Sequence, residues 1–146
     1  MKALLLANLL IGGYNFGTVW AHELDIFRTW TRVGERFHEV QRAHWRKLPY
    51  WVFAPVALGL ITAVVMVWFH PEGSPAWGIW GSLGSQILSL VLTAAFWGRW
   101  QAKLANDARG ADSPYLRKIL RTHWVRTGLV TANAVILVLW AIAAFG

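Results

Sequence analysis

Side chains able to take part in chemistry are few in this chain, and they gather near the ends of its apolar stretches. The clearest are four residues that we expect to form a catalytic site: His22, His44, His123 and Arg126. Imidazole can act as a general acid or base near neutral pH, and a guanidinium can stabilise an enolate-like oxygen. The residue types therefore indicate acid–base chemistry on a substrate that develops negative charge.

Other polar side chains lie inside the apolar stretches, where they are costly. Asn8, Asn15 and His22 are spaced by seven residues, so they share one stripe of a helix, with Glu23 beside its lower end. Polar groups in a membrane segment turn into the bundle, because lipid leaves their hydrogen bonds unmade. We expect Glu23 at the edge of a polar cavity and Asn15 deeper in it, both as cofactor- or ligand-binding residues. Asn8 and Asn15 could instead serve only as interhelical hydrogen-bond partners.

The last apolar stretch repeats this pattern. At about 100° per residue, His123, Arg126 and Asn133 fall within about 80° of one another on a helix. We expect Asn133 to be a third cofactor- or ligand-binding residue, deep in the same cavity. The alternatives are that Arg126 extends to lipid headgroups as an ordinary helix-end cation, and that the histidines are neutral structural residues.

A metal site is a second interpretation of the same residues. Three imidazoles and a carboxylate, from His22, Glu23, His44 and His123, could bind iron, copper or zinc. No pair has a compact ligand spacing such as His-x-x-x-His, so the sequence identifies no cofactor. The chain has no Cys, which excludes thiolate ligands and thiol catalysis.

The composition points to a membrane. Of 146 residues, 56% are hydrophobic, 14% are charged and 11 are Trp. Apolar stretches cover residues 3–20, 50–69, 77–97 and 127–145, each near the ~20 residues that cross a bilayer. We predict an all-α fold, an integral membrane four-helix bundle forming a single domain over residues 1–146.

Charge predicts the orientation. Six Lys or Arg lie in residues 21–49 and seven in 98–126, but none lies in 70–75. The positive-inside rule places the two basic segments in the cytoplasm and both termini outside, as in a multi-pass protein of the bacterial inner membrane. Cations in blocks beside apolar stretches favour anionic lipid as the partner, and nucleic acid is not expected.

Residues 30–48 have an apolar face opposite a charged one. Trp30, Val33, Phe37, His44 and Leu48 fall on the apolar side. The pattern predicts an amphipathic cytoplasmic helix between spans 1 and 2, either lying at the membrane surface or continuing into the second span.

Small residues recur every four positions in the third stretch, at Gly81, Ser85, Ser89 and Thr93. Such stripes let helices approach closely in lipid. The stripe predicts packing within the bundle or, alternatively, a homo-oligomer contact.

In size and in its four spans the chain resembles small bacterial membrane proteins of unknown function, and it is distantly similar to the anthrone-oxygenase-like membrane family. Two segments carry the resemblance, Arg42-Ala-His44-Trp before the second span and His123-Trp-Val-Arg126 before the last. The resemblance implies cofactor-free oxidation of a polycyclic phenol.

Two functions follow as hypotheses. The first is a membrane-embedded enzyme or cofactor-binding protein that acts on a lipophilic small molecule at the cytoplasmic end of the bundle. The second is a non-catalytic subunit or scaffold of a larger membrane complex, motivated by the small-residue stripe in the third span.

Overall fold

The computed structural model describes all residues, 1–146, as four long helices without any strand. The first long helix comprises α1 (Lys2–Ala21), η1 (His22–Ile26) and α2 (Phe27–Trp30). The second comprises η2 (Gly34–Arg36), α3 (Phe37–Leu48), η3 (Pro49–Phe53) and α4 (Ala54–Val65). The third comprises α5 (Ala76–Leu92), η4 (Thr93–Trp97) and α6 (Gly98–Ala105). After η5 (Gly110–Asp112), the fourth is α7 (Pro114–Phe145).

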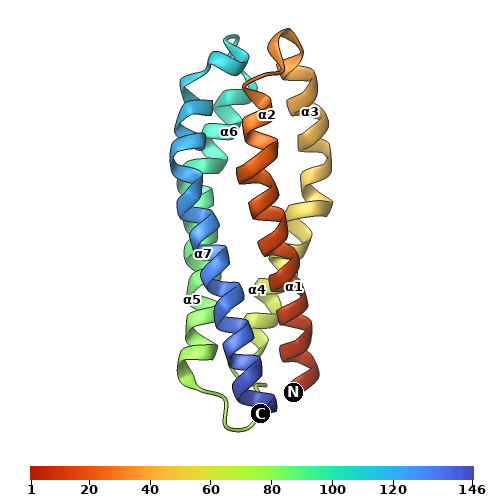
Figure 1. Cartoon of the computed structure of the whole chain (residues 1–146), viewed down its shortest axis with the longest axis vertical. Helices are drawn as coiled ribbons and strands as arrows, with labels where there is room; N and C mark the ends of the chain where they lie inside the picture. The colour runs from red at the N-terminus through yellow and green to blue at the C-terminus, as the bar shows by residue number, and fades with distance from the viewer.

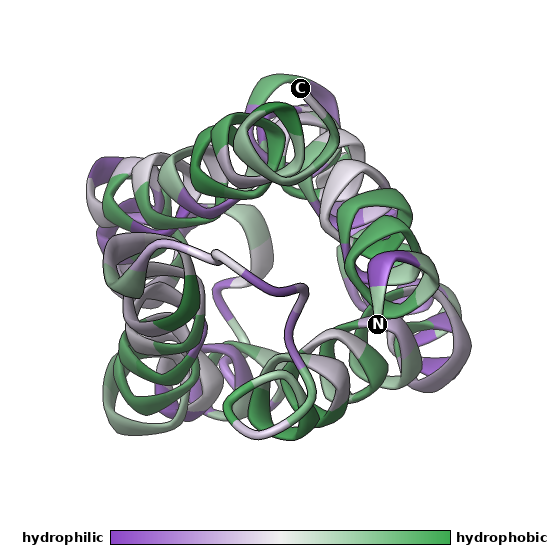
Figure 2. Cartoon of the chain, turned by 90° about the horizontal axis from the view of Figure 1, so that it is seen from below, coloured by the Kyte–Doolittle hydropathy of each residue, from purple (hydrophilic) through white to green (hydrophobic).

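The four helices run alternately up and down. Both termini and the 66–75 connection lie at one end of the bundle, and the other two connections lie at the opposite end (Figure 1). Viewed along the axis, the helices stand at the corners of a square, where α1 contacts α4 and α7, and α5 contacts the same two (Figure 2). All four are long and apolar enough to cross a membrane, which makes the chain a candidate multi-pass membrane protein.

The helices are longer than the apolar stretches that predicted them. They have 29, 32, 30 and 32 residues, or about 45 Å each at 1.5 Å per residue. The two basic segments, residues 21–49 and 98–126, are mostly the ends of these helices. Charged side chains do not stop a helix that leaves the apolar layer, because its backbone hydrogen bonds are internal and its charges point outward.

The predicted amphipathic helix is interrupted near its start. Trp30 ends the first long helix, and the chain turns before Gly34, whose φ of +62° suits glycine better than other residues. Trp30 and Val33 therefore do not belong to α3, although the Trp30 ring still packs against Phe37 with centroids 6.0 Å apart. α3 continues without a break through η3 into α4, as in the predicted arrangement in which this helix continues into the second apolar stretch.

The bundle interior has an apolar cluster toward each end. The cluster near the termini contains Leu5, Met66, Ile79, Leu137, Trp140 and Ala141. The cluster near the opposite end contains Phe27, Trp30, Phe37, Leu104, Leu116 and Ile119. Between them the interior is lined largely by polar side chains, so the two clusters enclose a polar layer in the middle of the fold.

The small-residue stripe of α5 packs inside the bundle. A Cβ on Gly78 would lie 2.8 Å from the Trp140 ring, and one on Gly81 would lie 3.3 Å from Ile136. Ser82 then donates a hydrogen bond to Asn133 at 3.0 Å. The first part of the stripe is thus used against α7, as the intrabundle interpretation predicts, and the homo-oligomer contact stays a prediction.

A proline is accommodated in the second helix by a side chain from the first. Pro55 has no N–H, so the carbonyl of Trp51, four residues earlier, lacks its usual helical donor. The Tyr14 hydroxyl donates to that carbonyl at 3.1 Å. An interhelical bond therefore supplies a donor that Pro55 cannot provide.

The 106–113 connection is held by its own side chains. Ser113 caps α7 by accepting from the Tyr115 N–H, and its hydroxyl donates to Asp107 at 2.7 Å. Arg109 donates two bonds of 2.9 Å to the same carboxylate. These donors, Arg109 first, hold the pKa of Asp107 well below its usual range.

Candidate functional site

Three of the four long helices depart from regular α geometry at one level of the bundle. Each contains a π-helical turn, η1, η3 or η4, while α7 is regular throughout. In a π-turn, residues five apart share a face, and Arg28 accordingly donates to the Glu23 carboxylate at 3.0 Å. Such turns are rare and often occur at functional sites.

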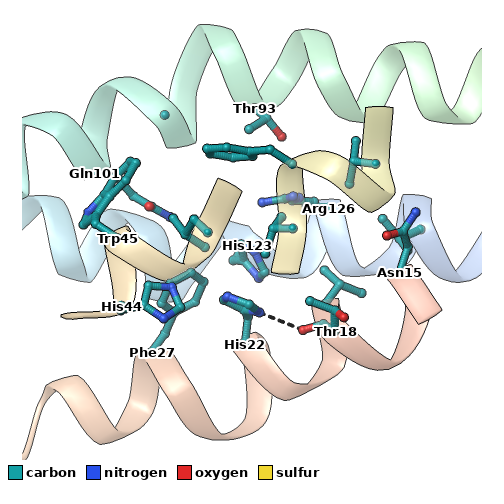
Figure 3. Close-up of a pocket in the computed structure, with 17 residues that line it drawn as sticks. Asn15, Thr18, His22, Phe27, His44, Trp45, Thr93, Gln101, His123 and Arg126 are labelled. Carbon is teal, nitrogen blue, oxygen red and sulfur yellow. Dashed lines mark hydrogen bonds between the residues drawn. The ribbon is translucent and has the colours of Figure 1, made fainter. Parts of the chain in front are cut away.

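The π-turns surround a cavity of about 70 Å³ between the two apolar clusters. Figure 3 shows His22, His44, His123 and Arg126 around this space. They come from three different long helices, in η1, α3 and α7. The structure therefore brings together all four residues predicted as catalytic, and Asn15 lines the same cavity.

His22 is fixed by the backbone of its own helix. Its Nδ1 lies 2.7 Å from the Thr18 carbonyl, which can only accept, so Nδ1 donates. The neutral ring then has its lone pair on Nε2, which is buried without a partner. The ring thus presents a base or ligand atom whose hydrogen-bonding capacity is unused.

His123 is held by Glu23 from a position 100 residues earlier in the chain. Its Nδ1 lies 2.8 Å from the Glu23 carboxylate, and the side chains are 0% and 1% exposed. An ionised carboxylate can only accept, so Nδ1 donates and Nε2 of a neutral ring is free. That Nε2 is also buried without a partner.

Glu23 itself differs from its prediction. It does not line the cavity but lies behind His123, also bonded to Arg28. Glu23 lies one helical step, about 100°, from His22, so its side chain points to the side of the stripe that contains Asn15 and His22. Its position suits orientation of His123 rather than contact with a bound molecule.

His44 completes the group from the second helix. Its ring centroid lies 5.1 Å from that of His22 and 5.3 Å from that of Trp30, and its Nε2 is buried without a partner. Phe27 packs edge-on against His22 and His123, at 5.5 and 4.8 Å. Aromatic rings thus fix three imidazoles whose Nε2 atoms are all unpaired.

Arg126 has no partner in the chain. It belongs to none of the ion pairs, and its Nε is buried without a hydrogen bond. Its side chain lines the cavity in the interior, so it does not extend to lipid headgroups, contrary to that alternative. An unpaired cation in the interior is costly, and an anionic ligand would relieve that cost.

A second cavity, of about 90 Å³, continues from the first toward the middle of the bundle. Arg126, Asn15 and Thr93 line both. Asn133 lines only the deeper cavity, and its Oδ1 accepts from Ser82 at 3.0 Å and Ser85 at 3.2 Å. The depth predicted for Asn133 is therefore right, but part of its polar group is already bonded.

Sequence reasoning missed several lining residues of the third helix. Ser85, Ser89 and Thr93 were assigned to helix packing, yet they line one or both cavities, and Gln101 lines the first. A usable signal existed, because the four-residue spacing from Ser85 to Thr93 extends to Gln101 two steps later. Asn8 is buried with neither polar atom bonded, and it lines neither cavity.

The metal interpretation gains nothing from the geometry. No group of three or more His, Asp or Glu side chains in the chain is placed to hold a metal ion together, and this includes His22, Glu23, His44 and His123. What the arrangement offers is an oriented imidazole with a free Nε2 beside an unpaired guanidinium. Such a pair can remove a proton and stabilise the anion that results.

No family model, curated protein or solved structure matches this chain. Its function must therefore be inferred from the site itself.

Proposed function

We propose that the chain is an integral protein of the bacterial inner membrane, with both termini outside and the 31–33 and 106–113 connections in the cytoplasm. Large apolar side chains on the outer faces support insertion, among them Leu10 and Leu58, which are 75% and 53% exposed. All Lys and Arg residues except Lys2 lie in the half of the bundle away from the termini, which supports this orientation.

Exposed aromatic residues support a specific depth. Trp51 of η3 and Trp68, three residues beyond the end of α4, are both exposed. The helix rises about 21 Å from Trp51 to Val65 at 1.5 Å per residue, so the two indoles bracket most of a hydrocarbon core of ~30 Å, as aromatic belts do. His123 is adjacent to exposed Trp124, so the first cavity would lie just beneath the inner interface.

We propose that this protein is an enzyme that removes a proton from a lipophilic substrate with an acidic oxygen or an acidic C–H next to a carbonyl. His123 Nε2 is the base, Glu23 orients His123, and Arg126 stabilises the anion. His22 and His44 provide further hydrogen-bonding groups for substrate. The proposal depends on one observation: the buried Glu23–His123 pair leaves Nε2 free in the cavity that Arg126 also lines.

General magnitudes set the expected contributions. A positioned base contributes about 10²–10⁴-fold, and one oxyanion donor about 10²–10³-fold. A partner that only orients a histidine contributes about 10–100-fold. Substitutions of His123 and Arg126 should therefore reduce turnover more than substitution of Glu23.

The resemblance suggests that the substrate is a polycyclic phenol and that the reaction is an oxidation. The balanced reaction converts a CH₂ between two aromatic rings into C=O, consuming one O₂ and releasing one H₂O. Proton removal from that CH₂ forms the phenolate-like anion that reacts with O₂. The residues His123 and Arg126 supply what the first step requires, and O₂ is the oxidant.

The test uses anthrone as the substrate and the full chain in lipid nanodiscs, with oxygen uptake and product absorbance as readouts. We expect turnover by the wild type, with a loss of at least about 100-fold in His123→Gln. His70→Gln, at the opposite end of the bundle, is the matched control and should retain full activity. Equal turnover by His123→Gln and the wild type would exclude His123 as the base.

A further inference from the structure

We propose that the deeper cavity is a binding site for a membrane-dissolved acid, that is, an apolar body bearing one ionisable oxygen. The acid enters sideways from the bilayer between the second and third helices and places its oxygen at Arg126. This inference rests on the proposed function for membrane insertion, and it adds to that function the substrate class and the route of entry.

The lining of the deeper cavity is that of a lipophile site. Most of its wall surface is apolar and comes from Phe53, Val56, Leu60, Leu90, Leu129 and Val130. The other seven lining residues are polar: Asn15, Ser85, Gln86, Ser89, Thr93, Arg126 and Asn133. Apolar wall surface with placed polar groups is typical of small-molecule pockets.

The cavity has an opening toward the lipid. Phe53 of η3 and Leu90 of α5 both line it, yet they are 49% and 45% exposed on the outer surface. A residue that lines a cavity while exposed outside marks a thin or open part of the wall. The neighbouring outward residues Ile87 and Val91 are also exposed and apolar, so this opening faces lipid rather than water.

Charge selects an acid. Arg126 is the only charged residue that lines either cavity, and no Asp or Glu lines them. The buried carboxylate of Glu23 is bonded to His123 and Arg28, so it does not neutralise Arg126. A single anionic oxygen therefore neutralises the interior, whereas a cation or a second anionic group would not be matched.

The two cavities place the bound acid for reaction. Arg126, Asn15 and Thr93 line both, so an oxygen at Arg126 lies at the boundary between them. The apolar body then occupies the deeper cavity, and the reactive end faces the first cavity with the unpaired Nε2 atoms of His22 and His123. A fatty acid and a polycyclic phenol share this chemistry.

Binding can be measured without turnover. The full chain in nanodiscs is titrated with 1-hydroxypyrene and, separately, with cis-parinaric acid, and energy transfer from the 11 Trp residues is recorded. The neutral controls are 1-methoxypyrene and methyl parinarate. We expect saturable transfer for at least one acid, about 10-fold weaker for its neutral counterpart and for Arg126→Gln. The acid that saturates identifies the source as phenol or fatty acid.

Matched variants test the cavity. Ser89→Leu adds an apolar side chain to the lining and should weaken binding about 10-fold. Gly84→Leu makes a similar change on the same helix, where an added Cβ meets nothing within 4 Å, and it should bind like the wild type. Transfer that never saturates and is equal in all variants would show simple partitioning into lipid and overturn the proposal.

The entry route has its own test, because the chain contains no Cys. A single Leu90→Cys variant carrying a bulky thiol label should slow association of the acid about 10-fold, and labelled Val91→Cys, exposed but not lining the cavity, should not. Equal rates for both labels would refute the sideways route. His123→Gln should still bind the acid, so the two proposals fail separately. If the wild type shows no saturable binding, the binding site in the deeper cavity is refuted. If His123→Gln turns over substrate normally, the role of His123 as the base is refuted.

Discussion

Removal of the Glu23 carboxylate should reveal two very unequal partners. The bond to His123 is fully buried, whereas the Arg28 side chain is 48% exposed. A hydrogen bond to a charged group contributes about 1.5–3 kcal/mol, but an ion pair open to water contributes about 0–1 kcal/mol. Glu23→Ala should therefore destabilise the fold by about 1.5–4 kcal/mol, the sum of these ranges, most of it through His123.

Double-mutant cycles separate the two contacts. One cycle combines Glu23→Ala with His123→Leu, and the other combines it with Arg28→Ala. We expect a coupling energy of about 2 kcal/mol in the first cycle and below about 1 kcal/mol in the second. Loss of ring packing in His123→Leu occurs in both arms of its cycle, so it cancels from the coupling energy.

The measurement is reversible unfolding in mixed dodecyl maltoside and SDS micelles, followed by the fluorescence of the 11 Trp residues. In the same variants, His123→Leu should lose more activity than Glu23→Ala, because His123 is the base and Glu23 only orients it. A coupling energy for Glu23 and His123 no larger than that for Glu23 and Arg28 would refute a buried, oriented pair, and with it the assigned role of Nε2.

Other predictions concern packing, backbone bonding and pH. Gly78→Ala should lower the free energy of unfolding by about 1–3 kcal/mol, because the added Cβ would lie 2.8 Å from the buried Trp140 indole. Gly84→Ala is the control, because an added Cβ there meets nothing within 4 Å. Thermal unfolding should show Gly84→Ala to be as stable as the wild type or more stable. Tyr14→Phe should lower the free energy of unfolding by about 0.6 kcal/mol in the wild type. It should have no effect in a Pro55→Ala background, where the Trp51 carbonyl regains a helical N–H donor. An equal loss of stability in both backgrounds would contradict this role of Tyr14. The lowered pKa of Asp107 means that its ionised form is favoured by folding. The stability advantage over Asp107→Asn should thus be full above about pH 5 and shrink as pH falls below the ordinary value of ~3.9, measured as the difference in melting temperature.

Much of the fold follows from local pattern. Four helices long and apolar enough to cross a membrane could be predicted from apolar length alone, because a bilayer of fixed thickness demands about 20 apolar residues from any helix that crosses it. The inward direction of the polar stripes also followed, since Asn15, His22, His123 and Arg126 repeat at helical spacing. Five predicted site residues, these four and His44, accordingly meet in one cavity.

Helix ends and π-turns did not follow from that pattern. Apolar length locates a span but not the point where its helix ends, so the break at residues 31–33 was not foreseen within the helix predicted over residues 30–48. A π-turn changes the facing of every later residue by one step, and no residue type marks it in the sequence. Glu23 was assigned to the cavity because it is adjacent to His22, but its bonds to His123 and Arg28 hold its side chain behind His123.

The sequence by itself determined which side chains must face inward. An amide, imidazole or guanidinium is costly to expose to lipid, and helical spacing shows which of these side chains share one face of a helix. Only the tertiary structure decided how those groups are paired. Glu23 bonds His123 across 100 residues while Arg126 is left without a carboxylate, and such pairing depends on helix rotation and register, which local spacing does not encode.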